Sequence, residues 1–221
     1  MEIVPTVCVV DDDEGVCRAL KRLLGSVGLA VETFASANDF LQKCSQPRSG
    51  CLILDVRMPG MSGLELQAAM AARHMCLPII FITAHADVPM SVQAMKGGAV
   101  DFIQKPFSEQ TLLDAVHKAV AVDAETRHRQ ADRESILRRL EQLTPREREV
   151  MGLVVQGRLN KQIARELGAS EKTVKVHRGR VMQKMEADSL ADLVLQAQAV
   201  GMAGPGRAAN GSNGKSATTP T

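Results

Sequence analysis

The first half of the chain predicts an α/β fold, a doubly wound parallel sheet of five strands, from three observations. Short, continuous apolar runs recur along it, which is typical of strands that are buried on both faces. Helical patterns separate these runs. Charged or hydroxyl side chains follow the runs, at the strand ends where parallel sheets form functional crevices. The runs predicted as strands are 7–10, 30–34, 51–54, 79–82 and 100–103.

Helices are predicted between these strands, and the glycines and hydroxyl residues near them suggest where they begin and end. Gly25 and Gly28 are expected to close the first helix. Ser62 is expected to cap the third one. With five β/α units in about 115 residues, we expect one compact α/β domain over residues 1–121. The predicted helices are roughly 14–27, 37–44, 63–72, 89–96 and 109–121.

The second half predicts a linker, an all-α domain and a tail. Residues 122–142 contain no Gly or Pro and pair opposite charges four residues apart, which predicts a helical linker, either solvated or paired with a second copy. Residues 143–202 predict a four-helix domain in which helices capped by Asn160 and Ser170 form a helix-turn-helix. Residues 203–221 are rich in small polar residues and are predicted to be disordered.

Composition indicates a cytoplasmic protein whose two halves differ in charge. The chain is 45% hydrophobic and 24% charged, and none of its apolar runs approaches the roughly 18 residues of a membrane helix. Residues 1–122 carry 10 Lys and Arg against 13 Asp and Glu, whereas residues 123–221 carry 17 against 12, and this basic half favours a nucleic-acid partner. The 5 cysteines form no CxxC pair, so we interpret them as buried thiols in a reducing compartment.

Three carboxylates, a hydroxyl and an ammonium group are predicted to meet at the carboxyl ends of the strands. The residues are Asp11, Asp12, Asp55, Thr83 and Lys105. Crowded carboxylates repel one another unless a cation such as Mg²⁺ neutralises them. With Mg²⁺, Lys105 and Thr83 to balance the charge, Asp55 could accept a phosphoryl group. Taken alone, the first aspartates could simply begin a helix and Lys105 could be a solvated lysine. The joint pattern favours the phosphoryl site. The Lys105–Pro106 bond could be cis, which could direct the lysine inward.

These motifs make residues 5–121 resemble the receiver domain of two-component response regulators. The matching strings are Val-Asp-Asp-Asp-Glu at 10–14, Leu-Asp-Val-Arg-Met-Pro-Gly-Met-Ser-Gly at 54–63, Ile-Thr-Ala at 82–84 and Asp-Phe-Ile-Gln-Lys-Pro-Phe at 101–107. Residues 88–99 are especially similar to the FixJ branch. The resemblance implies a flavodoxin-like fold and a sensor histidine kinase that phosphorylates Asp55.

The same resemblance implies a Mg²⁺ site and a switch. Asp12 would bind Mg²⁺ directly, Asp11 would act through water, and Asp55 and the backbone carbonyl of Arg57 would complete the protein ligands; no other cofactor is expected. Thr83 and Phe102 would form the switch pair, Phe102 swinging inward as Thr83 turns toward the phosphoryl group. This motion would reshape the face made by the fourth helix and the fifth strand, through which a homodimer would form.

Residues 143–201 predict a DNA-binding domain. The third helix is apolar on one side and basic on the other, which suits the major groove, although a solvated amphipathic helix would show the same pattern. Leu-Thr-Pro-Arg-Glu-Arg-Glu-Val at 143–150 and the stretch from Ser170 to His177 resemble the LuxR/NarL/FixJ family. His177 could instead pack inside the domain, and the fourth helix could serve as the family's dimer contact or only close the core. The resemblance implies that the DNA-contacting residues are Lys172, Thr173, Lys175, Val176, His177, Arg178, Arg180 and Lys184.

The function predicted from these features is that of a transcription regulator rather than an enzyme. Phosphorylation of Asp55 would promote dimerisation and promoter binding, with activation through RNA polymerase implied by the resemblance. Two alternatives stay open at this stage. One is a phosphate-independent regulator that responds to oxidation of Cys8 or Cys51, which the Asp/Thr/Lys set argues against. The other is an Asp-based phosphohydrolase, although such enzymes carry the nucleophile on the first strand.

Overall fold

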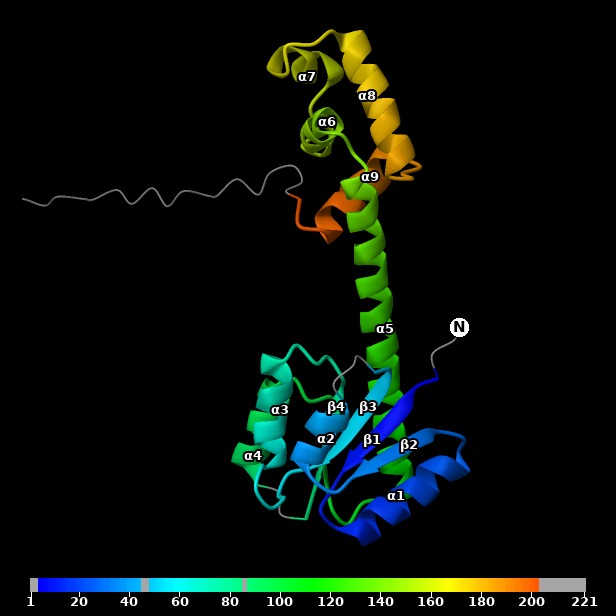
Figure 1. Ribbon diagram of the computed structural model, residues 1–221, viewed down its shortest axis with the longest axis vertical. Coiled ribbons are helices and arrows are strands. Elements are labelled where there is room, and N and C mark those ends of the chain that lie inside the picture. The colour runs from blue at the N-terminus through cyan, green and yellow to red at the C-terminus, as the bar shows by residue number, and fades with distance from the viewer. Residues whose placement is uncertain (1–3, 45–47, 85–86, 203–221) are drawn as a thin grey trace, which may run out of the picture. The chain divides into compact units, whose positions relative to one another are not determined.

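The computed structural model describes residues 4–44, 48–84 and 87–202 (Figure 1). The chain divides into two compact units, Met1–His128 and Arg129–Thr221, and each is described by itself. The tail that was predicted to be disordered, residues 203–221, lies outside the described residues.

A parallel sheet of five strands forms the centre of the first unit, as predicted. Its strands lie in the order β2-β1-β3-β4-β5. Their bounds differ from the predicted runs by one residue at some ends, because the runs followed mainly apolar side chains whereas backbone pairing also includes polar residues such as Thr83 and Gln104. The strands are β1 (Thr6–Val10), β2 (Ala30–Phe34), β3 (Gly50–Asp55), β4 (Ile79–Thr83) and β5 (Asp101–Gln104).

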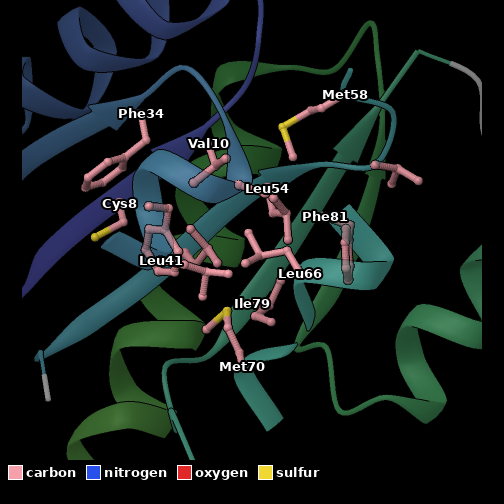
Figure 2. Packing of buried hydrophobic residues seen from close by; sticks show 14 of the residues in the cluster. Cys8, Val10, Phe34, Leu41, Leu54, Met58, Leu66, Met70, Ile79 and Phe81 are labelled. Atoms are coloured by element: carbon pink, nitrogen blue, oxygen red, sulfur yellow. The ribbon is translucent and has the colours of Figure 1, made fainter. Parts of the chain in front are cut away.

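Helices cover both faces of this sheet, which makes the unit doubly wound. The helices are α1 (Glu14–Ser26), α2 (Ala37–Lys43), α3 (Gly63–Ala72), α4 (Val88–Lys96) and α5 (Glu109–Glu141). Because successive side chains of a strand point to opposite faces, each strand supplies two cores. Cys8 and Val10 of β1 pack in the core that contains residues of α2 and α3, part of which Figure 2 shows. Val7 and Val9 pack in the core that contains residues of α1 and α5.

Local signals at the helix ends agree with the sequence in some places and differ in others. Ser62 caps α3 in a capping box, accepting a hydrogen bond from the Glu65 backbone N–H while the Glu65 carboxylate accepts one from the Ser62 backbone N–H. Gly28 follows α1 with a φ of 83°, a backbone conformation that favours glycine. Gly25 lies inside α1, so the expectation that it closes this helix was wrong: the helix continues to Ser26, and its C-cap is Val27.

Helix α5 does not end at residue 121, where a separate linker was predicted to begin. It continues to Glu141 because no Gly or Pro interrupts its 33 residues. Its first part supplies Leu112 and Val116 to the core of the first unit. Its last part supplies Ile136 and Leu140 to the core of the second unit. The predicted linker segment is therefore the continuation of the last helix of the first unit.

The second unit packs four further helices around an aliphatic core. They are α6 (Pro145–Val155), α7 (Asn160–Glu166), α8 (Glu171–Lys184) and α9 (Leu190–Ala199). Met151, Ile163, Val181 and Leu193 are completely or almost completely buried in this core. Thr144 is the N-cap of α6 and forms a capping box with Glu147. The N-cap of α7 is Leu159 rather than Asn160. The Leu159 side chain makes no capping hydrogen bond; instead, the Gln162 side chain accepts a hydrogen bond from the Leu159 N–H.

Candidate phosphoacceptor pocket and DNA-binding face

The parallel sheet places two aspartates side by side at its carboxyl edge. Val10 of β1 is paired with Leu54 of β3, so the residues that follow them in the sequence, Asp11 and Asp55, lie at neighbouring positions. Both carboxylates are buried, with 2% and 6% of the residue exposed. Lys105, directly after β5, donates to both: its Nζ lies 2.8 Å from Oδ2 of Asp11 and 3.0 Å from Oδ1 of Asp55.

The electrostatics of this pocket keep Lys105 charged. Burial lowers the pKa of Lys105, but its hydrogen bonds to Asp11 and Asp55 outweigh burial and raise the pKa above its ordinary value. Burial raises the pKa of Asp55, and the Lys105 ammonium opposes that rise. An ammonium group shared by two carboxylates therefore balances much of the negative charge at this edge of the sheet.

The loop after β3 approaches Asp55 closely. The backbone N–H of Arg57 donates to Oδ2 of Asp55 at 2.6 Å. Gly63, the first residue of α3, lies so near that a Cβ there would be 2.3 Å from the Asp55 backbone oxygen. Asp55 thus presents Oδ1 to Lys105 and Oδ2 to a backbone donor, so each carboxylate oxygen has a fixed partner.

Other predicted pocket residues lie around this centre. Thr83 is the last residue of β4 and is 1% exposed. Asp12 is exposed and follows the buried Asp11. The Lys105–Pro106 peptide bond is cis. The described residues contain no cluster of three or more His, Cys, Asp or Glu side chains that could hold a metal ion.

This donor set nevertheless suits Mg²⁺. Mg²⁺ is usually held by one or two carboxylates, with water and phosphate oxygens as its remaining ligands. Asp11 and Asp55 supply buried carboxylate oxygens that already attract a cation, the Lys105 ammonium. The acidic side chain of Asp12 and the carbonyl of Arg57 are further oxygen donors in the two adjoining loops. The residues therefore fit the ion that the sequence predicted.

Phe102 of the predicted switch pair is half-buried on β5. Its ring packs on that of Phe81 in β4, with centroids 6.2 Å apart and an interplanar angle of 40°. The two residues are direct partners across the β4–β5 pairing. Sequence reasoning assigned no role to Phe81, because an apolar residue inside a buried strand looks like any other core residue.

Most of the predicted DNA-contacting residues lie on the exposed side of α8. Lys172, Thr173, Lys175, Val176 and Arg180 are exposed, whereas Val174 and Val181 of the same helix are buried. Ser170 caps α8 by accepting the Thr173 N–H at 3.1 Å. This arrangement leaves a basic face at the start and middle of the helix, where major-groove readers contact bases and phosphates.

Three of the predicted DNA contacts have partners inside the domain or point inward. Arg178 donates to Oδ1 of Asn160 at 3.3 Å, which joins α8 to the start of α7. His177 is half-buried, and its Nδ1 is buried without a hydrogen-bond partner among the described residues. Lys184 donates to the Glu147 carboxylate at 2.6 Å and to the Gln142 carbonyl at 3.1 Å.

The Lys184–Glu147 ion pair is internal to the second unit. Glu147 is 2% exposed, and the Lys184 hydrogen bond is the largest cause that lowers the pKa of Glu147 to about 2. The sequence offered no signal for this pair, because the two residues are 37 positions apart on different helices. Lys184 therefore has Glu147 as a structural partner. Among the described contacts, the exposed lysines Lys172 and Lys175 of the same helix have no such partner.

Comparison with known proteins identifies both units. The model of the response regulator receiver domain matches residues 7–117, and that of the bacterial regulatory proteins of the luxR family matches residues 141–197. The chain is a LuxR/FixJ-type response regulator. The resemblance and the fold class predicted from the sequence are thereby confirmed. As a response regulator with a receiver and a helix-turn-helix domain, it is a DNA-binding transcription regulator rather than an enzyme.

Relatives match this response regulator over most of their length. Nodulation protein W of Bradyrhizobium diazoefficiens is 50% identical over 196 residues, which cover 89% of this chain and 86% of that protein. Transcriptional regulatory protein FixJ of Azorhizobium caulinodans is 44% identical over 195 residues, covering 88% of this chain and 92% of that one. Because this chain has the receiver domain of a response regulator, it belongs to a two-component system, in which a sensor kinase is the partner of that domain.

Solved structures agree with this assignment. The response regulator StyR has a TM-score of 0.78 and 49% sequence identity, and the match covers 88% of this chain and 98% of StyR. Full-length FixJ from B. japonicum has a TM-score of 0.56 and 40% identity, covering 91% of this chain and 99% of FixJ.

Within the described residues, no helix is both long and apolar enough to cross a membrane.

Proposed function

We propose that Asp55 accepts a phosphoryl group from a sensor histidine kinase and that this modification controls promoter binding. The observation that carries the proposal is the position of Lys105, whose Nζ contacts the buried carboxylates of both Asp11 and Asp55. Phosphoryl transfer needs little covalent chemistry from a protein, and depends on positioning and on neutralising charge. An in-line attack by one Asp55 oxygen would leave Lys105 beside the phosphoryl oxygens.

Mg²⁺ is the proposed cofactor of this step. Asp12 would ligate it directly, Asp11 through water, and Asp55 and the Arg57 carbonyl would complete the protein ligands. When bound, Mg²⁺ would neutralise charge that develops on the transferred group. The chain's own residues do the remainder: the Arg57 N–H orients the Asp55 carboxylate, and the Thr83 hydroxyl is placed at the end of β4 to meet a phosphoryl oxygen.

The signal is proposed to leave the pocket through Thr83 and Phe102. A turn of Thr83 toward the phosphoryl group would let the half-buried Phe102 ring move further inward. The neighbouring helix α4 exposes three apolar side chains, Val88, Val92 and Met95, on one helical face. Such a face at the α4–β5 side of the receiver fits the homodimer predicted for the phosphorylated state.

The second unit is proposed to bind promoter DNA as part of that dimer. Two copies of α8 related by a two-fold axis would bind half-sites of matching symmetry. Lys172, Lys175 and Arg180 would contact phosphates or base edges through the exposed face of α8. Bound in this way, the protein would activate transcription by recruiting RNA polymerase. The compartment proposed for this work is the cytoplasm, where promoter DNA would be accessible to the protein.

The redox alternative is disfavoured by the surroundings of the thiols. Cys8 and Cys51 are both 0% exposed, and burial raises the pKa of each to about 12. Because the thiolate is the form that oxidants attack, buried thiols of this kind react slowly. DNA binding that ignores Asp55→Ala but changes with oxidant would revive this alternative.

Sedimentation velocity with Mg²⁺, with and without beryllofluoride, tests the proposed phosphoryl switch. Beryllofluoride mimics a phosphoryl group on an aspartate, so the wild-type chain should shift from monomer to dimer. Asp55→Asn is the variant without the acceptor carboxylate and should stay monomeric. A chelator added to the wild type should abolish the shift, because the acyl-phosphate mimic needs the divalent cation. Equal sedimentation of wild type and variant would contradict the proposal.

A further inference from the structure

The ring of Phe81 lies where the proposed switch has to move. Phe81 on β4 is the direct cross-strand partner of Phe102 on β5, and their ring centroids are 6.2 Å apart. Phe81 and Thr83 are two residues apart on the same strand, so their side chains point to the same face of the sheet. Phe81 is therefore next to both members of the proposed switch pair.

The two rings of this contact differ in burial. Phe81 is 0% exposed and is fixed in the core that also contains Leu54, Leu66 and Ala94, part of which Figure 2 shows. Phe102 only borders this core and keeps part of its ring accessible. A half-buried ring beside a fully buried one can gain contact by moving inward and lose it by moving out.

We propose that Phe81 is a positioning residue that favours the inward orientation of Phe102 and so lowers the threshold for activation. This inference rests on the proposed function of Asp55, Thr83 and Phe102. An aromatic pair contributes an attraction beyond simple area burial that amounts to about a threefold to tenfold change in an equilibrium constant. An aliphatic side chain at residue 81 would fill space without supplying this attraction.

The consequence is a change in how much phosphoryl mimic is needed. When only a fraction of the receiver is in the competent state, the apparent affinity of a ligand for it falls by that fraction. If Phe81 raises the inward fraction of Phe102, the chain needs less beryllofluoride to reach half-maximal dimerisation. Removing the ring should therefore raise that midpoint by about threefold to tenfold.

A second aromatic pair provides a matched control in the same core. Phe34 and Phe40 pack edge to face, with centroids 5.3 Å apart, between β2 and α2. Both rings belong to the same core cluster as Phe81, but they lie on β2 and α2 rather than on the strands that carry Thr83 and Phe102. Phe40→Leu removes an aromatic pair and lowers stability without touching the proposed switch.

The experiment is a beryllofluoride titration with Mg²⁺, in which sedimentation gives the dimer fraction of the full-length chain. The variants are Phe81→Leu, Phe102→Leu, the double variant and Phe40→Leu, with Phe81→Met as a second substitution if Phe81→Leu does not fold. We expect each single change at 81 or 102 to raise the midpoint threefold to tenfold and the double variant to rise no further. Phe40→Leu should keep the wild-type midpoint.

The outcomes separate this inference from the function on which it rests. A midpoint in Phe81→Leu equal to that of Phe40→Leu, or additive changes in the double variant, would overturn the role of Phe81 and leave the phosphoryl switch intact. A wild type that does not respond to beryllofluoride would overturn the switch itself and the role of Phe81 with it.

Discussion

Replacing Lys184 by Met is predicted to weaken the second unit without removing a DNA contact. The substitution deletes the ammonium group that contacts the Glu147 carboxylate at 2.6 Å and the Gln142 carbonyl at 3.1 Å. Glu147, which is 2% exposed, would keep its hydrogen bond from the Thr144 N–H but lose its counter-ion. A buried carboxylate without a counter-ion destabilises the state that contains it.

The size of the loss follows from the pKa of Glu147. A carboxyl group whose pKa falls from 4.5 to about 2 on folding stabilises the folded state by about 3 kcal/mol at neutral pH. Thr144 supplies part of this effect, and the Lys184 side chain is 33% exposed, so solvent screens the pair. We therefore expect Lys184→Met to destabilise the second unit by about 1–2 kcal/mol.

Hydrogen exchange and DNA binding together measure this prediction. A loss of 1–2 kcal/mol lowers the protection of core amides in α6 and α8 by about fivefold to thirtyfold. The slope of log affinity against log salt concentration for DNA binding should stay as in the wild type. Lys175→Met, an exposed lysine of the same helix, is the matched control and should show the reverse: unchanged protection and a slope smaller by about one. Unchanged protection together with a reduced slope in Lys184→Met would refute the structural role and restore this lysine as a DNA contact.

Three further predictions follow from single contacts. Because the pKa of Glu147 in the folded state lies below its ordinary value, the stabilisation that the Glu147 carboxylate gives is complete above about pH 4.5 and is lost as pH falls toward about 2. Glu147→Gln should remove this part of the pH dependence of stability. A variant whose stability falls with acid as the wild type's does would contradict this prediction. Gly63→Ala would put a Cβ 2.3 Å from the Asp55 backbone oxygen, so the rate at which acetyl phosphate phosphorylates the chain should fall at least about tenfold, measured by intact mass. In the control Gly25→Ala the added Cβ meets nothing within 4 Å, so this rate should equal that of the wild type. Asp123→Ala removes an acceptor of the Ser49, Gly50 and Arg127 donors and should lower stability in urea by about 1–3 kcal/mol; an unchanged midpoint would contradict this.

The sheet and its edge could be predicted because their signals are local. Buried parallel strands appear in the sequence as continuous apolar runs, and the residues after them must meet at one edge of the sheet. Lys105 is 94 positions from Asp11 and 50 positions from Asp55 along the chain, and this topology still brings it into contact with both. The roles assigned to them remain predictions until phosphorylation is measured.

Other features could not be predicted because they depend on contacts between distant elements. The continuation of α5 to Glu141 lacks a breaking residue that would mark a boundary, so sequence alone suggested a separate linker. The Lys184–Glu147 pair joins helices whose relative orientation no local pattern specifies. Leu159 caps α7 through the Gln162 side chain, although Asn160 has the higher intrinsic preference for a cap.

DNA affinity with and without beryllofluoride tests the central claim most directly. Wild-type chain and Asp55→Asn are titrated with a palindromic promoter fragment in Mg²⁺ at one fixed salt concentration, because affinity for DNA depends strongly on salt. The account predicts that beryllofluoride tightens binding of the wild type at least about tenfold, as expected when a dimer forms before binding paired half-sites. Asp55→Asn should bind with one affinity in both conditions. Equal responses in the two proteins would mean that DNA binding is not controlled through Asp55.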